Sequence, residues 1–319
     1  MNAPTGSLAK PDDGARVKRQ KRDIHGWLVL DKPVGMTSTH AVSVIKHLFA
    51  ARRAGHAGTL DPLASGCLPI ALGEATKTVP FVMEGRKRYV FTVRWGEESE
   101  TDDSEGNITK RSDERPTNAG VRGILSRFVG QIEQVPPRYS AIKVAGERAY
   151  DLARDGELVE LAPRPAEVSW LDIVSAPDRD HTVFAAECGK GTYVRALARD
   201  MGRALGCYAH VSALRRTAVG PFTEEHARAL QALEFACAQE GSLPMQPLLP
   251  VEAGLADLPA VRVSSADAGR LSRGQSVILR GRDAPVLAGW AYVCSPASLV
   301  ALVEVEQGTL KPRRVFNIQ

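Results

Sequence analysis

The stretch from Gly55 to Gly66, which reads G-H-A-G-T-L-D-P-L-A-S-G, constrains this chain more than any other. Asp61 is its only carboxylate and is surrounded by glycines and a proline. Glycine permits backbone conformations that other residues avoid, and Pro62 favours an extended conformation at Asp61. The run therefore predicts a loop that presents one carboxylate, as a nucleophile or general base is presented. The alternative is a turn in which Asp61 bonds to nearby backbone or caps the next element.

The composition is that of an ordinary globular protein. The chain has 319 residues, of which 44% are hydrophobic and 24% charged, so we expect two domains. No apolar run approaches the ~20 residues of a membrane helix, and residues 1–22 lack the apolar core of a secretory signal, which favours the cytoplasm. The five cysteines form no C-x-x-C pair, so neither a disulfide framework nor a zinc site is indicated.

The charge is unevenly distributed along the chain. Residues 1–22 carry six Lys or Arg against two Asp, and residues 260–319 carry eight Lys or Arg against four Asp or Glu. Each end therefore has a net charge of +4, and residues 23–259 have −4, within a total of +4. Basic ends suit a protein that holds a polyanion. The alternative is a solubilising tail plus ordinary surface charge.

Hydrophobic periodicity predicts an α+β fold. We expect strands at His25–Asp31, Cys67–Leu72, Arg88–Trp95, Val168–Val174, Thr182–Cys188 and His210–Val219, and helices at Thr37–Ala50, Thr78–Glu84, Val121–Val129, Glu147–Arg154, Thr192–Leu205 and His226–Ala238. Because these do not alternate regularly, a mixed, largely antiparallel sheet with flanking helices is preferred over a parallel one. Residues 1–22 are predicted to be a disordered basic tail, and the three prolines of Gly241–Pro250 indicate a linker.

The Asp61 loop and the following L-P-I-A-L-G-E-A-T-K closely resemble the catalytic signature of the bacterial tRNA pseudouridine synthase B family, which modifies the T-loop uridine of tRNA at position 55. In that family the aspartate is catalytic, and the match falls on Asp61. The resemblance covers most of residues 25–220. It implies a pseudouridine synthase catalytic domain at 23–245. The last sixty residues resemble a small PUA-like RNA-binding β-barrel, giving a second domain at 246–319.

Two further motifs carry the resemblance to the active site. The phrase K-R-Y places Tyr89 where the family has a tyrosine that stacks on the target base and assists proton removal. The run G-K-G-T-Y-V-R implies that Arg195 pairs with the catalytic aspartate and that Tyr193 lines the pocket. An arginine partner would hold Asp61 ionised. Lys190 and the first N–H groups of the following helix are available to a phosphate.

The remaining matches concern substrate positioning and support. Leu214 matches a position that packs on the flipped base, and His56 one that occupies space vacated in the RNA loop. Lys32 and Pro33 match a pair that braces the active-site loop. Plain core packing for the leucine and an idle loop histidine are the alternatives. Two further matches, V-P-P-R-Y-S-A-I-K and a T-x-D-x-x-G turn, are interpreted as structural, and Arg215 and Arg216 as phosphate contacts or solvated side chains.

The resemblance implies isomerisation of uridine to pseudouridine on the T-arm stem-loop of tRNA. The base is flipped out, detached, rotated and reattached, and this chemistry uses no metal, redox cofactor or nucleotide. No Walker loop, dinucleotide fingerprint or metal-ligand motif occurs in the sequence, in agreement with this. We expect a monomer. The alternatives are an RNA-folding chaperone and a glycosidase, which would need a second carboxylate such as Glu74.

Overall fold

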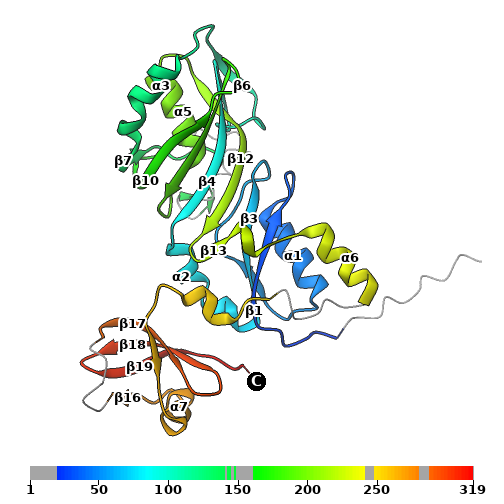
Figure 1. Ribbon diagram of the computed structural model, residues 1–319, viewed down its shortest axis with the longest axis vertical. Coiled ribbons are helices and arrows are strands. Elements are labelled where there is room, and N and C mark those ends of the chain that lie inside the picture. The colour runs from blue at the N-terminus through cyan, green and yellow to red at the C-terminus, as the bar shows by residue number, and fades with distance from the viewer. Residues whose placement is uncertain are drawn as a thin grey trace, which may run out of the picture.

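The computed structural model describes most of the chain. It covers residues 20–140, 142–144, 147–148, 161–240, 248–279 and 287–318. The molecule is elongated, and its long axis follows the central strands of a large sheet with a smaller module at one end (Figure 1). The predicted tail at 1–22 lies almost wholly outside the described residues. The predicted boundary at 245–246 also does, and it stays a prediction.

The large sheet has ten strands within the described residues, in the order β14-β1-β3-β12-β4-β11-β10-β7 with β2 beside β3 and β13 beside β12. Its strands are β1 Gly26–Lys32, β2 Ala54–His56, β3 Ser65–Leu72, β4 Lys87–Trp95, β7 Gly130–Gln134, β10 Arg164–Ser175, β11 His181–Cys188, β12 Ala209–Val219, β13 Phe222–Thr223 and β14 Ala227–Ala229. Only the β1–β14 and β12–β3 pairs are parallel. The predicted mixed, largely antiparallel sheet is confirmed.

Helices cover the sheet in two groups (Figure 1). α1 Ser38–Leu48 and α6 Leu230–Glu240 lie near β1 and β3, whereas α3 Asn118–Ile124 and α5 Val194–Ala204 lie at the other end of β4 and β12. α1 begins where expected, because the Thr37 side chain accepts a hydrogen bond from the His40 amide. α5 buries one apolar stripe, including Leu197 and Met201, against the sheet.

Short elements complete the larger unit of the molecule, which is built on the ten-stranded sheet. They are the 3₁₀ turns η1 Gly73–Lys77, η2 Leu125–Phe128 and η3 Glu224–His226, the helix α2 Val79–Glu84, and the strand pairs β5 Glu97–Ser99 with β6 Ile108–Arg111 and β8 Lys143–Val144 with β9 Glu147–Arg148. Pro80 lies in the first turn of α2, where its missing N–H costs no helical hydrogen bond.

The C-terminal module is a second sheet packed on this larger unit. Its elements are η4 Val251–Leu255, β15 Ala260–Arg262, α7 Ser265–Ser272, β16 Val277–Ile278, β17 Gly289–Cys294, β18 Leu299–Glu306 and β19 Thr309–Val315, with the strands in the order β15-β17-β18-β19-β16. A shared apolar cluster buries Trp27 of β1 with Leu302 and Phe316. The Lys77 ammonium also donates to the Val315 carbonyl at 2.6 Å. Both apolar packing and polar contacts therefore join the module to the larger unit.

Two predicted elements are wrong in detail. The helix expected from His226 begins only at Leu230, because residues 227–229 pair in parallel with β1 and form β14. Glu147 and Arg148, expected to begin a helix, form β9, and the rest of that predicted helix lies outside the described residues. Pairing with distant strands overrode local helical pattern in the first case.

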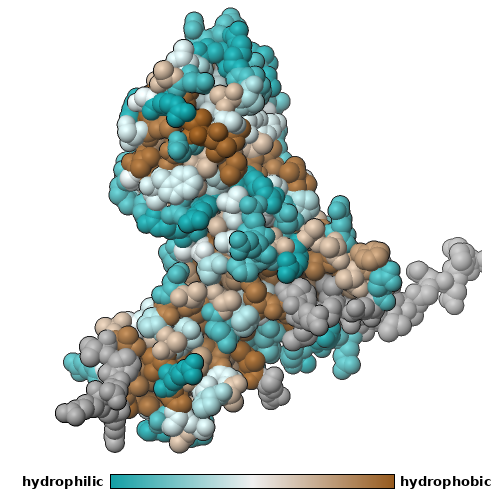
Figure 2. Space-filling model, in the orientation of Figure 1, coloured by the Kyte–Doolittle hydropathy of each residue, from teal (hydrophilic) through white to brown (hydrophobic). Residues whose placement is uncertain are grey.

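The surface is mixed in polarity. Figure 2 shows polar residues over much of one face, with apolar patches both on the end that carries β10 and on the C-terminal module. The large exposed apolar side chains include Trp170 and Val174 of β10 and Trp290 of β17. Among the described helices, none is long and apolar enough to cross a membrane.

Candidate active site

The loop that carries Asp61 connects β2 to β3 and is held from one side by Lys32. This lysine is fully buried, and its ammonium donates to the carbonyls of Pro33 at 2.9 Å, Met36 at 2.7 Å and Pro62 at 3.4 Å. The amide of Gly35 donates to the same Pro62 carbonyl at 2.8 Å. Burial lowers the pKa of Lys32 to about 8, and the nearby carboxylate of Asp61 opposes that fall. Lys32 thus joins the end of β1 to the residue after Asp61.

Arg216 of β12 holds the same loop from beneath. Its side chain is almost fully buried and donates to the carbonyls of Gly58 at 2.9 Å, Thr59 at 3.2 Å and Cys67 at 2.9 Å. Gly58 has a φ of +104°, and a Cβ there would lie 3.3 Å from the guanidinium. The interpretation of Arg216 as a phosphate contact or solvated side chain is wrong, because its donors are directed into the protein.

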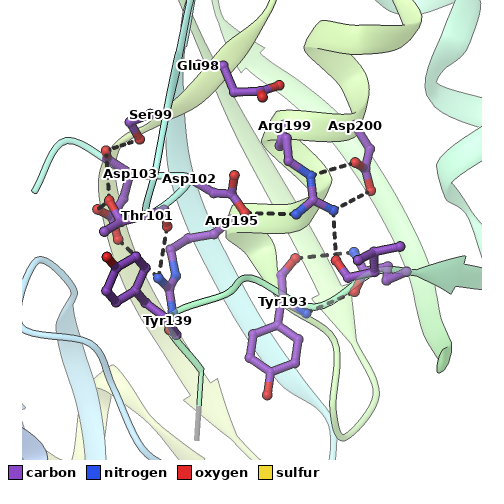
Figure 3. Close-up of polar contacts among 12 residues, drawn as sticks. Glu98, Ser99, Thr101, Asp102, Asp103, Tyr139, Tyr193, Arg195, Arg199 and Asp200 are labelled. Atoms are coloured by element: carbon purple, nitrogen blue, oxygen red, sulfur yellow. Dashed lines mark hydrogen bonds and ion pairs between the residues drawn. The ribbon is translucent and has the colours of Figure 1, made fainter. Parts of the chain in front are cut away.

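Arg195 lies beside Asp61 and is fixed by three other groups. Its Nε is 3.0 Å from Asp61 Oδ2. Its terminal nitrogens donate to the carbonyls of Thr101 at 3.0 Å and Tyr139 at 2.9 Å, and one lies 3.4 Å from Asp103 Oδ2 (Figure 3). A guanidinium held at both terminal nitrogens presents its remaining donor in one direction. The structure therefore brings together Asp61 and the arginine expected to pair with it.

The carboxyl of Asp61 has an altered proton affinity. Burial raises its pKa above the ordinary value, the Arg195 guanidinium opposes the rise, and the Asp103 carboxylate adds to it. The expected arginine partner is present but does not reverse the effect of burial. About a third of the Asp61 side chain is still exposed, at 36%. The site thus presents one reachable carboxyl whose ionisation depends on Arg195.

Tyr89 and Leu214 lie on neighbouring strands behind this loop. In the register of β4 against β12, Tyr89 is opposite Arg216 and Leu214 is opposite Phe91. Because side chains two residues apart share a face of a strand, all four lie on one face of the sheet. Tyr89 is half-buried, and burial raises the pKa of its hydroxyl while a hydrogen bond from Arg216 opposes the rise. Leu214 is 8% exposed.

The other predicted site residues are placed less uniformly. Tyr193 immediately precedes α5, and its backbone exchanges two hydrogen bonds with the Gln134 side chain, at 3.1 and 3.2 Å. His56 ends β2, and burial together with Arg216 lowers the pKa of its ring. Lys190 forms a surface ion pair with Glu84, and both side chains are more than half exposed. Among the described residues, no hydrogen bond or ion pair joins Lys190 to Asp61 or Arg195.

Sequence reasoning missed three charged residues around the site. Asp103 was noted only as part of a turn, yet it is buried and lies against Arg195. Arg199 of α5 is buried and bonds the neighbouring Asp102. Arg216 was assigned to the surface. For Arg199, the available signal was its four-residue spacing from Arg195 along a helix that also carries the apolar stripe.

The described residues contain no group of three or more His, Cys, Asp or Glu side chains arranged to hold a metal ion. The free cysteines are buried, apart from the partly exposed Cys294. Burial raises the pKa of Cys67, which lies near the loop, to about 12, so its thiol stays protonated. The thiol of Cys67 therefore adds no nucleophile to the loop.

Comparison with known proteins assigns the family. A model described as TruB family pseudouridylate synthase (N terminal domain) matches residues 46–194, and one described as tRNA pseudouridylate synthase B C-terminal domain matches residues 195–256. A tRNA pseudouridine synthase B from Bradyrhizobium diazoefficiens is 64% identical over 97% of this chain and 91% of that protein. The chain belongs to the tRNA pseudouridine synthase B family. The Agrobacterium fabrum member is 52% identical over 97% of this chain and all of its own length.

Solved structures agree with this family assignment. A chain in the crystal structure of a Cbf5-Nop10-Gar1 complex matches with a TM-score of 0.71 and 26% identity, covering 92% of this chain and 85% of that one. A chain in the archaeal box H/ACA sRNP Nop10-Cbf5 complex matches with a TM-score of 0.70 and 25% identity, covering 92% and 87%. The predicted pseudouridine synthase-like fold with a PUA-like C-terminal module, and the predicted membership of this enzyme family, are confirmed.

Proposed function

We propose that this enzyme isomerises the T-loop uridine of tRNA, at position 55, to pseudouridine. The observation that carries the proposal is the contact of Asp61 with Arg195 in a loop braced by Lys32 and Arg216. Family membership supports the class of reaction, because relatives that share most of the chain are named tRNA pseudouridine synthase B. The basic C-terminal module is proposed to hold part of the tRNA. Action as a monomer in the cytoplasm completes the proposal.

The reaction conserves atoms and needs no external electrons. The N1–C1′ bond of the uridine breaks, the base rotates, a C5–C1′ bond forms, the C5 proton leaves and N1 gains a proton. Asp61 is proposed to begin it by attacking C1′ or C6 or by abstracting a ribose proton, each of which needs the ionised carboxylate. Arg195 keeps that carboxylate directed at the substrate.

The side chains of Tyr89 and Leu214, which share one face of the sheet, are proposed to receive the flipped base. Flipping costs about a few kcal/mol, which stacking and hydrogen bonds in a pocket offset. An aromatic ring and an apolar side chain on one face of the sheet suit this task. Tyr89 is then placed beside the base to assist removal of the C5 proton. His56 and Tyr193 are proposed to position the RNA around the pocket, and Lys190 to contact phosphate.

A glycosidase function is disfavoured by the state of the neighbouring carboxylates. Glu74 is 3% exposed and bonds Arg53, Lys77 and the Asn317 amide, so it is committed to the junction with the C-terminal module. Asp103 lies against Arg195 and accepts from the Thr101 hydroxyl at 2.5 Å. Neither of these two is free to act as the second carboxylate of a glycosidase, which leaves the exposed Glu105 as the remaining candidate near Asp61.

The function is tested by incubating the enzyme with an unmodified tRNA T-arm stem-loop and mapping pseudouridine by chemical-adduct primer extension. One stop at the T-loop uridine is expected. A stop elsewhere in full-length tRNA, with none in the stem-loop, would contradict the proposed position. Release of free uracil would support a glycosidase, and tight binding without any stop would support an RNA chaperone.

Replacing Arg216 with Lys is expected to lower kcat about 10- to 100-fold, since lysine keeps the charge but cannot reach two loop carbonyls and the Cys67 carbonyl of β3 at once. Single-turnover assays with the enzyme in saturating excess over tRNA measure the change. The control is Arg215→Lys at the adjacent position, where the half-exposed side chain pairs with Asp31 and Glu224. If both variants lose activity equally, the loss reflects general damage to β12.

Replacing Tyr89 with Phe is expected to lower kcat about 100-fold while leaving tRNA affinity within about three-fold, because the ring still stacks but the hydroxyl is lost. Rates of tritium release from C5-labelled uridine measure the step directly. The Phe variant retains the half-buried ring, so unfolding is not expected. Normal tritium release would exclude the Tyr89 hydroxyl from proton removal.

A further inference from the structure

Helix α5 carries three arginines at four-residue spacing, Arg195, Arg199 and Arg203, which therefore lie on one side of the helix. Their partners come from one segment of chain in reverse order. Arg195 lies against Asp103, Arg199 against Asp102 and Arg203 against Glu98. All three acidic residues are buried. This ladder joins α5 to the segment that follows β4.

The middle pair of the ladder lies directly behind the arginine of the active site. Arg199 is 5% exposed, and its Nη1 lies 2.9 Å from Asp102 Oδ2. Asp102 has a φ of +60°, a left-handed conformation that non-glycine residues rarely adopt. In an extended strand, successive side chains point to opposite sides. The turn at Asp102 instead lets two consecutive carboxylates face the same helix (Figure 3).

Both arginines also hold a third segment of chain. Arg195 donates to the Tyr139 carbonyl at 2.9 Å (Figure 3), and Arg199 donates to the Val135 carbonyl at 2.7 Å. The two guanidinium groups therefore clamp the same pair of segments, near residues 101–103 and residues 135–139, one helical turn apart. The half-exposed Arg203 pairs with Glu98, and within the part of the chain that the structure describes no hydrogen bond joins it to residues 135–139.

We propose that Arg199 and Asp102 are positioning residues that fix the orientation of Arg195 toward Asp61. Arg195 uses both terminal nitrogens on acceptors of the two clamped segments, so the direction of its Nε depends on where those acceptors lie. Arg199 bonds Asp102 and the Val135 carbonyl, and so holds the same two segments in place from the next turn of α5. The inference rests on the proposed role of Arg195 in the reaction.

The test uses Asp102→Asn and Arg199→Lys in the full-length enzyme. Asn is nearly isosteric with Asp, tolerates the left-handed conformation and still accepts a hydrogen bond. In Asp102→Asn the guanidinium of Arg199 keeps the Asp200 carboxylate, 2.8 Å from its Nε, as a counter-charge. Each variant is expected to lower kcat on the order of ten-fold while KM changes less than about two-fold.

The matched control is Arg203→Lys, which perturbs an ion pair of the same helix and the same acidic segment. It is expected to leave kcat within about two-fold even if the melting temperature falls. Rates are measured in single turnover and normalised to the folded fraction from circular dichroism. Equal losses of kcat in Arg203→Lys and Asp102→Asn would overturn the proposal, since a general weakening of α5 would then explain both.

A double-mutant cycle separates this inference from the proposed function. If Asp102 acts through Arg195, adding Asp102→Asn to Arg195→Met is expected to cause no further loss of kcat. Multiplying losses would overturn the positioning role. If Arg195→Met alone retains normal kcat, the proposed role of Arg195 fails and the positioning role with it. If Arg195→Met is impaired while Asp102→Asn and Arg199→Lys are normal, only the present inference fails.

Discussion

Asp61→Asn is expected to abolish pseudouridine formation, lowering the single-turnover rate by at least ~10⁴-fold, because the amide cannot act as nucleophile or base. Binding of tRNA is expected to stay within a few-fold, since the loop is held by Lys32 and Arg216 through backbone carbonyls that the substitution does not touch. Primer extension after adduct formation measures turnover, and filter binding measures affinity.

The matched control for Asp61→Asn is Glu105→Gln. Burial and the nearby carboxylates of Asp103 and Asp61 raise the pKa of the exposed Glu105, so its substitution removes a negative charge close to Asp61. Turnover by Glu105→Gln is expected within about three-fold of normal. Near-normal turnover by Asp61→Asn would show that the catalytic carboxylate is another residue. Normal rescue of cells by that variant would favour an RNA-folding role.

Arg195→Lys is expected to lower kcat roughly 100-fold, because lysine keeps the positive charge but cannot contact Asp61 while also bonding the Thr101 and Tyr139 carbonyls. The tRNA affinity is expected to change little. Single-turnover rates with the enzyme in saturating excess over tRNA measure the effect, and the melting temperature reports on the buried neighbours. A near-normal rate would remove Arg195 from contact with the reacting groups.

The pH profile distinguishes loss of the positive charge at residue 195 from loss of the planar guanidinium geometry. Burial raises the pKa of Asp61 and Arg195 opposes the rise, so the acid limb of the activity profile is expected above the ordinary range of an aspartate. Arg195→Met removes the opposing charge, which raises the pKa further and moves this limb to higher pH. Arg195→Lys keeps the charge and is expected to leave the limb nearly unmoved. Identical limbs in all three enzymes would show that a group other than Asp61 governs the acid side.

The sequence predicted most elements of the large sheet because their information is local. The alternation in Arg88–Trp95 and the compact apolar run in Cys67–Leu72 correspond to β4 and β3, and both strands are largely buried. The helix at Thr37–Ala50 had both periodicity and a capping residue. The same approach was wrong at residues 227–229, whose conformation is decided by pairing with β1. Local pattern cannot report a partner about 200 residues away.

The residues of the candidate site likewise fall into those that the sequence predicted and those that it did not. The glycines and proline around Asp61 disclosed a loop that presents one carboxylate, and the resemblance named Arg195 and Tyr89. The burial of Arg216 was beyond reach, since arginine is normally exposed, and for Arg199 the signal was its four-residue spacing from Arg195. Each is buried only because carbonyl and carboxylate acceptors from distant segments converge on it. The acceptors of Arg216 are backbone carbonyls, which residues of any type carry, so they leave no mark in sequence.

The sequence by itself determined the loop of Asp61, the family of the enzyme and the strands that support the site, because these depend on residue type and short-range spacing. Tertiary structure alone decided how that loop is held and where Arg195 points. Orientation depends on the relative positions of β12, α5 and the turn at Asp102, which lie far apart in the chain and meet only after folding. Burial then set the pKa of Asp61, since removing water from a carboxyl is a property of its surroundings.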